Sequence, residues 1–266
     1  MKTKLLALAT LALLFSCSKN DEAIANEQQE LPVKITRKNA NGTVQSTKTL
    51  SYDNKKRLSE VTHTDAISTN SYKAIFVYEP NKIKLITNFL DASQIDREYT
   101  YTYSSGKLVK EEHYQNNVLD VIFTVKRNND GTETHTAKNP TGTLLYTMNY
   151  IFGGKGNIIS RRTDEADPSK TDFTITYEGY DNNPRAIFEP RAATLGYAFA
   201  YGRINAPLLP NNPVAYKYTF DGYSPSIFER YEYQYTPSGK VKSIKTLNAL
   251  NSNELTLTRE YEYQLF

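Results

Sequence analysis

The sequence predicts an all-β protein, an antiparallel meander of hairpin repeats with about 14 to 16 strands. An aromatic strand end, a polar turn and a basic-hydrophobic strand start recur along the chain. Within the segments, apolar or aromatic residues alternate with polar ones; Tyr99, Tyr101 and Tyr103 are separated by threonines. The mean hydropathy is -0.60 despite 21 tyrosines and 11 phenylalanines. This combination is typical of strands with one buried and one wet face.

The pattern of residues 1–16 predicts a cleaved export signal. Lys2 and Lys4 precede an apolar stretch from Leu5 to Phe15, which is too short to span a bilayer. Cys17 is the only cysteine, and the pattern around it resembles a lipobox, in which the cysteine is acylated. The alternative is an ordinary secretory signal with an incidental cysteine.

Residues 17–30 are polar and predict a disordered tether. The charged cluster just after Cys17 resembles the surface-export signal of lipoproteins from Bacteroidota. That resemblance implies an outer-membrane, lipid-anchored protein at the cell surface, with the membrane as its first partner.

Residues 31–266 predict the folded body, in which the repeat has a period of about 25 residues. A second turn, such as Asn116-Asn117, falls halfway through each period, so one repeat is a hairpin. The first-turn copies are Tyr52 to Leu58, Tyr78 to Ile83, Tyr101 to Leu108, Val125 to Gly131, Tyr150 to Ile158 and Tyr233 to Val241. Register and twist are not readable from these patterns, so an elongated twisted sheet and a partly curled barrel both remain open.

The period breaks at a proline-rich insert, residues 182–215. Prolines exclude a central strand there. We expect the insert to form either a short helix or an ordered loop that caps the sheet. It serves either as a binding face or only as a cover for a sheet edge.

The motifs resemble the YD-repeat proteins, whose unit carries a tyrosine, a turn often containing aspartate, and a glycine before a basic residue and leucine. Tyr52-Asp53 with Arg57-Leu58 and Gly106-Lys107-Leu108 carry this resemblance. The element from Asn211 to Tyr216 is similar to one in uncharacterised Bacteroidota lipoproteins of this Rhs-like kind. The resemblance implies a β-repeat body without an assigned activity.

No motif predicts an enzyme. The chain has no Gly-X-Ser-X-Gly elbow, and Cys17 is assigned to the lipid. The histidines, His63, His113 and His135, lack metal-ligand spacing, so neither a metal nor a cofactor is predicted. His63 and His113 occupy similar repeat positions, which suggests two exposed residues on one edge. The carboxylates that were considered for glycoside hydrolysis are Glu111-Glu112, Asp164-Glu165, Glu229 and Glu232.

The tyrosines have two interpretations: structural ladders between strands, or a platform for sugars or peptides. Tyr197, Tyr201, Tyr216 and Tyr218, in or beside the insert, are the candidate ligand-binding residues. A membrane barrel is disfavoured, because Glu260, Glu262 and Gln264 form a polar face where lipid requires an apolar one.

A non-enzymatic module that binds a glycan or an envelope protein is the first functional hypothesis. A structural scaffold of an envelope complex is the alternative, and a glycan-active hydrolase ranks last. Without Lys2 and Lys4, 30 basic residues balance 29 acidic ones, a net charge of +1, so nucleic acid is not an expected partner.

Overall fold

The computed structural model describes residues 29–68, 71–90, 97–184, 211–223 and 227–266. Strands make up its regular structure, and no helix occurs within these ranges. No described segment forms a helix long and apolar enough to cross a membrane. The predicted signal peptide, Cys17 and nearly all of the predicted tether lie outside the described residues, so the predicted division of the chain stays a prediction.

Eighteen strands follow one another along the chain. The first nine are β1 Glu30–Asn39, β2 Val44–Tyr52, β3 Leu58–Asp65, β4 Tyr72–Glu79, β5 Lys82–Phe89, β6 Arg97–Ser104, β7 Lys107–Gln115, β8 Val118–Arg127 and β9 Glu133–Lys138. The others are β10 Leu144–Phe152, β11 Ile158–Glu165, β12 Phe173–Tyr177, β13 Tyr180–Pro184, β14 Asn211–Pro213, β15 Ala215–Phe220, β16 Ile227–Tyr235, β17 Val241–Asn248 and β18 Glu254–Leu265.

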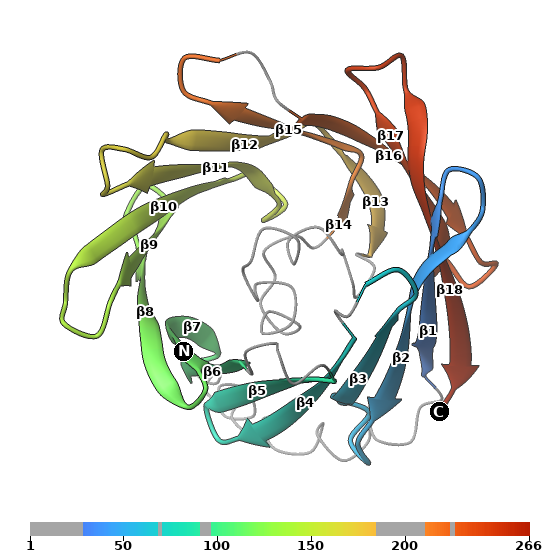
Figure 1. Ribbon diagram of the computed structural model, residues 1–266, viewed down its shortest axis with the longest axis horizontal. Helices are drawn as coiled ribbons and strands as arrows, with labels where there is room; N and C mark the ends of the chain where they lie inside the picture. The colour runs from blue at the N-terminus through green and yellow to red at the C-terminus, as the bar shows by residue number, and fades with distance from the viewer. Residues whose placement is uncertain (1–28, 69–70, 91–96, 185–210, 224–226) are drawn as a thin grey trace, which may run out of the picture.

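Sixteen strands form one closed antiparallel barrel, in which each strand pairs with its neighbour in sequence (Figure 1). Two exceptions complete the ring: β12 pairs with β15, and β1 pairs with β18. The prediction of a meander of hairpins is confirmed, and of the two shapes left open the barrel is the observed one. Closure leaves no free sheet edge.

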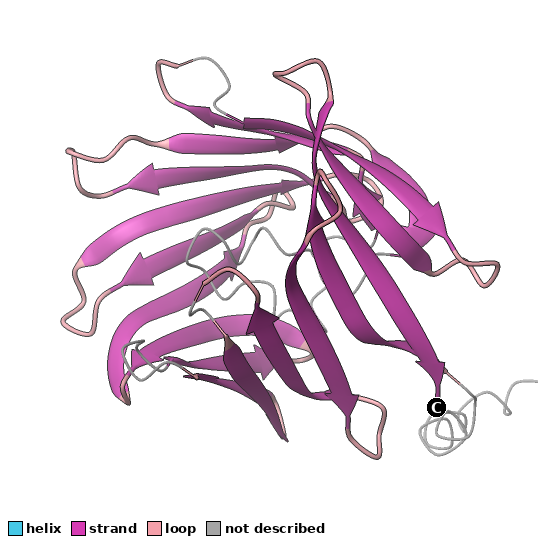
Figure 2. Ribbon diagram, turned by 45° about the vertical axis from the view of Figure 1, so that its right-hand side comes forward, coloured by secondary structure: helices cyan, strands magenta, loops and turns pink. Residues whose placement is uncertain are grey.

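The two kinds of predicted turn lie at opposite ends of the barrel, because consecutive hairpins in a meander alternate (Figure 2). We call one end the repeat-turn end; it carries the turns at 53–57, 80–81, 105–106, 128–132, 153–157 and 236–240. Asn116 and Asn117, at the other end, have φ values of 48° and 64°. Two successive residues with positive φ are what a tight hairpin turn requires.

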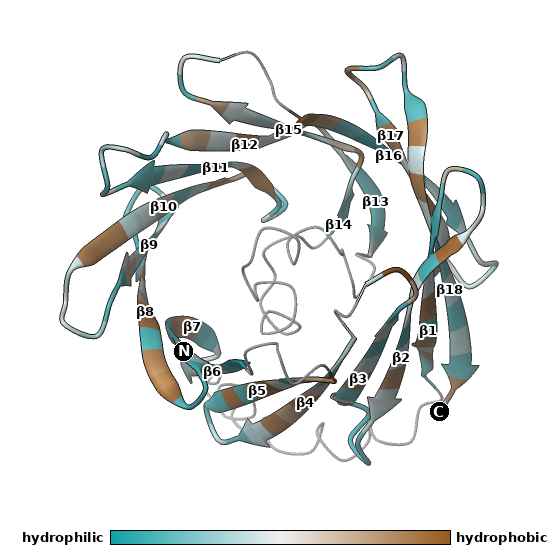
Figure 3. Ribbon diagram, in the orientation of Figure 1, coloured by the Kyte–Doolittle hydropathy of each residue, from teal (hydrophilic) through white to brown (hydrophobic). Residues whose placement is uncertain are grey.

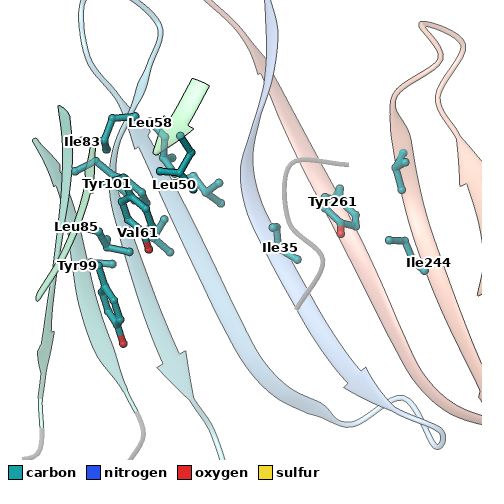
Figure 4. Close-up of a cluster of buried hydrophobic side chains, with 14 of the residues drawn as sticks. Ile35, Leu50, Leu58, Val61, Ile83, Leu85, Tyr99, Tyr101, Ile244 and Tyr261 are labelled. Carbon is teal, nitrogen blue, oxygen red and sulfur yellow. The ribbon is translucent and has the colours of Figure 1, made fainter. Parts of the chain in front are cut away.

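Residues alternate between two different faces along the strands (Figure 3). One face contains side chains that are fully buried, among them Val61, Leu85, Tyr101, Phe123 and Ile244, each 0% exposed. Because the barrel wall is a single layer, only its concave side lets side chains cover one another. We call this face the inner wall. Figure 4 shows part of it, with Val61 and Leu85 beside Tyr99 and Tyr101.

Tyrosines on the inner wall tie neighbouring repeat turns together. The hydroxyl of Tyr52 donates to the carbonyl of Pro32 at 2.7 Å, and that of Tyr78 to Leu58 at 2.9 Å. Tyr233 and Tyr263 bond Pro213 and Val241 in the same way, each at 2.8 Å. In three of these pairs the tyrosine lies near the end of one strand and the acceptor near the start of the preceding strand, while Pro213 ends β14, just before β15. The repeat therefore encodes a contact from one unit to the next.

The proline-rich insert interrupts the barrel between β12 and β15. Its two ends form the separate sheet β13–β14, in which Tyr180 pairs with Pro213 and Pro184 with Asn211. The exclusion of a central strand is consistent with this, since the two described prolines, Pro184 and Pro213, lie outside the barrel ladder. The helix or loop expected within the insert lies at 185–210, outside the described residues.

Candidate functional sites: the insert stem and the inner wall

Asp181 on β13 organises the stem from which the insert leaves the barrel. Its carboxylate accepts hydrogen bonds from the backbone and side-chain amides of Asn212, both at 3.1 Å, and from the hydroxyl of Tyr235. Asn212 is 1% exposed, so its polar groups have no access to water as an alternative partner. Burial, reinforced by the Asp181 carboxylate, raises the pKa of Tyr235 to about 12. The tyrosine therefore remains a neutral donor.

A pair of asparagines joins the same stem to the turn before β11. Asn157 donates to the side chain of Asn211 at 3.0 Å and accepts from the Asn211 backbone amide at 3.1 Å. Lys155, in the same turn, donates to Asn182 at 3.1 Å. The stem is thus fixed at one side by the β10–β11 turn and at the other by Tyr235 at the end of β16. The insert leaves the barrel from a rigid base.

Two of the four candidate ligand-binding tyrosines lie on the inner wall. Tyr218 is 7% exposed, and its ring centroid lies 4.8 Å from that of Phe173. Tyr216, half-buried, stacks on Tyr231 at 6.0 Å. Both belong to the packed aromatic ladder rather than to an open platform. Tyr197 and Tyr201 lie outside the described residues, and a binding role for any of the four stays a prediction.

The three histidines lie on the inner wall, each against a tyrosine. The ring centroids of His63 and Tyr72, and of His113 and Tyr99, are 4.8 Å apart, and His135 lies 4.6 Å from Tyr150. The two expected to be exposed at one edge are therefore within strands and at least half-buried, because strand alternation turns them inward. The described residues include no group of three or more side chains placed to hold a metal ion.

Burial lowers the pKa of His63 to about 4, and the charges of Lys48 and Arg37 act in the same direction. His113 Nε2 lies 2.7 Å from Oε1 of Glu111, a side chain with no exposed surface. These groups make the inner wall electrostatically uneven, with a basic region near His63 and a carboxylate near His113.

The considered carboxylate pairs do not face one another. Adjacent residues of a strand point to opposite faces, so Glu111 lies on the inner wall while Glu112 points outward, where it pairs with Lys110 at 2.7 Å. Glu165 and Asp164 divide in the same way, as do Glu229, which is 4% exposed, and Glu232. This arrangement brings together none of the carboxylate pairs that a glycosidase mechanism requires.

Two buried polar residues of the inner wall were not singled out from the sequence. Thr246 is 0% exposed and Arg259 is 2% exposed. The alternation of β18 offered a signal for one of them, since Arg259 has the same parity as the buried Tyr261 and Leu257.

The outward face is mostly threonine, lysine and glutamate. Lysine–glutamate pairs join neighbouring strands: Lys34–Glu262 at 2.6 Å, Lys38–Glu260 at 2.6 Å, Lys73–Glu60 at 2.7 Å and Lys84–Glu98 at 2.8 Å. Glu260 and Glu262 thus occupy the polar outer face expected for the last strand. Apolar residues are interspersed among them, such as Ile151 and the facing pair Ile75 and Ile86.

No family model and no curated protein matches the chain. Among solved structures, it is similar to a porin-like protein from Bacteroides vulgatus, with 16% identity and a TM-score of 0.60, covering 88% of this chain and 98% of that one. A porin-like protein from Bacteroides uniformis gives 15% identity and a TM-score of 0.58 over the same shares. These likenesses establish the barrel fold. The resemblance to YD-repeat proteins stays a prediction.

Proposed function

We propose that the chain is a non-enzymatic binding protein of the outer membrane, anchored through lipid on Cys17, with its barrel standing in water at the cell surface. The polar outward face carries this proposal. A barrel embedded in lipid needs an outward apolar band about 25 Å tall. Here Lys34, Lys38, Lys73 and Lys84 form ion pairs with glutamates across that surface.

Lipid would oppose these charges. A lysine or arginine on the lipid face costs about 2 to 4 kcal/mol at the bilayer midplane and less near the interfaces. In water these ion pairs pay no desolvation penalty, and each contributes little to the free energy of unfolding. An anchor on Cys17 is then needed to hold the barrel at the membrane, whereas a membrane-spanning barrel would not need one.

The buried inner wall argues against a pore. Barrels of 16 to 18 strands that act as porins leave a water-filled channel. In this barrel, inward residues from many strands are less than a tenth exposed, including Phe123, Met148 and Ile175. An inner wall whose side chains are covered in this way is unsuited to the diffusion of solutes.

The braced stem at Asp181 supports a binding role for the insert. Hydrogen bonds from both Asn212 and Tyr235 to Asp181 fix the base from which the insert leaves the barrel. A glycan or an envelope protein is the partner we propose. The packed tyrosines Tyr216 and Tyr218 favour the second candidate, a scaffold, because they offer no open platform.

Fractionation of cells that express the full chain or Cys17→Ser tests the location. We expect the wild-type protein in the outer-membrane fraction and Cys17→Ser in the soluble envelope fraction without detergent. A variant that stays in the outer membrane would overturn the proposal, since only a membrane-spanning barrel remains without its lipid.

Glycan and peptide arrays test the binding role. We expect the full chain to bind specifically, and a variant in which a glycine-serine linker replaces residues 185–210 to lose binding while keeping its thermal unfolding transition. Absence of binding by the full chain would favour the scaffold.

A further inference from the structure

We infer that the inner wall at β1, β17 and β18 holds a binding site for an oxyanion, a phosphate, sulfate or carboxylate group, with Arg259 as its central ligand. The described residues that form the site belong to the barrel wall. It goes beyond the proposed function, because it assigns a ligand class to a part of the barrel that the stem does not reach.

Arg259 is a buried cation without a protein partner. The residue is 2% exposed, its Nε has no hydrogen-bond partner, and no ion pair joins it to any described acidic residue. A guanidinium cannot lose its proton in a protein, so it cannot escape burial by becoming neutral. A buried charge that lacks a counter-charge costs several kcal/mol. A bound anion supplies the missing partner.

The neighbouring strands place further donors around Arg259. Arg37 lies directly opposite on β1, and Ile244 opposite on β17. Thr246, two residues beyond Ile244 on the same face, is 0% exposed, and its hydroxyl has no hydrogen-bond partner. Figure 4 shows Ile35, Tyr261 and Ile244 on the same three strands. A single anion near Arg259 therefore lies within reach of a second guanidinium and a free hydroxyl.

Two like charges that face each other across a ladder destabilise a sheet. Arg37 and Arg259 are such a pair, and an anion bound to Arg259 offsets the repulsion between them. Asp65 lies in the same row on β3, and its Oδ1 accepts the backbone amides of Ile67 and Ser68 at 2.8 and 2.9 Å.

The local field is positive for other groups too. His63, opposite Lys48 on β2, has its pKa lowered by burial first and then by Lys48 and Arg37, while Asp65 acts in the opposite direction and only partly offsets them. Its Nδ1 also lacks a hydrogen-bond partner. Since the local charges disfavour the protonated, cationic form of His63, they favour a bound anion.

The donor set selects oxyanions. Guanidinium groups present N–H donors in a planar fork that matches two oxygens of a carboxylate, sulfate or phosphate. A threonine hydroxyl adds a neutral donor for a further oxygen. The same chemistry is found on a free ion and on an acidic sugar, so the probes must include both.

Thermal unfolding of the full-length protein in mild detergent tests the site with sodium phosphate, sulfate and glucuronate, each against chloride at equal ionic strength. We expect at least one of the three to raise the melting temperature of the wild-type protein by several degrees. Arg259→Met should lose that gain, and equilibrium dialysis should show binding weakened about tenfold or more. A hydrophobic side chain of similar volume at a buried ionic position is usually tolerated, so this variant should fold.

Arg230→Met, on the exposed face of β16, is the matched control, because it removes the same charge from the outside of the barrel. It should keep the full anion response. Equal gains in wild type and Arg259→Met would show a general salt effect and overturn the site, as would no gain with any of the three anions. A response to glucuronate alone would place the anion on a sugar, and a response to phosphate or sulfate alone would identify a free ion.

Discussion

At the scale of single residues, the tyrosines do two tasks. Their rings bury apolar surface on the inner wall, while their hydroxyls bond a carbonyl of the preceding strand. Tyr78 illustrates both, because its hydroxyl meets Leu58 and the guanidinium of Arg57 lies 4.1 Å from its ring centroid. Burial raises the pKa of Tyr78 to about 12, so the donor proton is retained at any ordinary pH.

Tyr78→Phe should lower the free energy of unfolding by about 1 kcal/mol, because the Leu58 carbonyl loses its donor while ring packing is kept. Chemical denaturation of the two proteins measures the difference. Tyr223→Phe, at a side chain that is 69% exposed, is the control and should change stability little. Equal effects of the two substitutions would mean that the hydroxyl contact carries no stability.

His63 makes stability depend on pH. Its pKa is about 4 in the folded protein, below the ordinary value of 6.5, so the unfolded chain takes up the proton first. The stabilisation that comes from neutral His63 in the folded protein is fully present above about pH 6.5 and is lost as pH falls towards 4.

His63→Phe should therefore flatten the fall in melting temperature between pH 7 and pH 4.5, a window set by the pKa of about 4. Calorimetric scans of wild type and variant across this range are the measurement. Parallel curves would assign the acid lability to other groups.

The sequence contained the information for which residues point inward, but not what they meet. Alternation predicts that Tyr99 and Tyr101 share a face, and both are buried. The same rule turns His63 and Arg259 inward, where simple polarity would place them outside. Sequence patterns could not reveal what these inward side chains meet, because that depends on the closure of the barrel, which was not predictable.

At the scale of elements, turn chemistry was the most predictable feature. Paired asparagines at 116 and 117, and the glycine at 106, form the positive-φ turns that their residue types favour. The stem β13–β14 was less predictable, because its hydrogen bonds join Asp181 to Tyr235 across a sequence gap of 54 residues. Only the asparagine-asparagine-proline element hinted at it.

Asp181→Ala should open the stem while the barrel persists. It removes the carboxylate that accepts the backbone and side-chain amides of buried Asn212, which costs about 1 to 3 kcal/mol locally. Hydrogen exchange should show a faster Asn212 backbone amide and unchanged protection in β16 and β17. Asp130→Ala removes an exposed turn carboxylate and should leave Asn212 unaffected; a general loss of protection with Asp181→Ala would mean that the stem supports the whole barrel.

At the scale of the whole molecule, the repeat predicted the meander but not the ring. Each hairpin is specified locally, whereas β1 and β18 pair only through chain ends that no short-range pattern connects. Closure follows from the accumulated twist and tilt of many strands, which sequence alone does not give. Closure of the barrel also determines which face of the strands is exposed to water. The same closure determines whether the interior could act as a pore.

Truncation before β18 should abolish cooperative unfolding, because β1 and β17 would both become open edges along an uncovered inner wall. Circular dichroism melts and size-exclusion chromatography should show a broad transition and aggregation. Leu250→Ser, in the exposed β17–β18 turn, leaves the ladder intact and should melt like wild type. A truncated chain that unfolds cooperatively would show that an open sheet suffices.

The seam between the first and last strands also sets when the protein can fold. Lys38 and Glu260 meet across it although they are 222 residues apart, so the ring cannot close until the last strand has been synthesised. Contacts of such long sequence separation form slowly. For a chain that leaves the cell interior through a narrow translocation channel, as its predicted signal peptide requires, this delay is an advantage. A polypeptide exported in this way would stay unfolded during translocation and would close its barrel only after β18 had crossed.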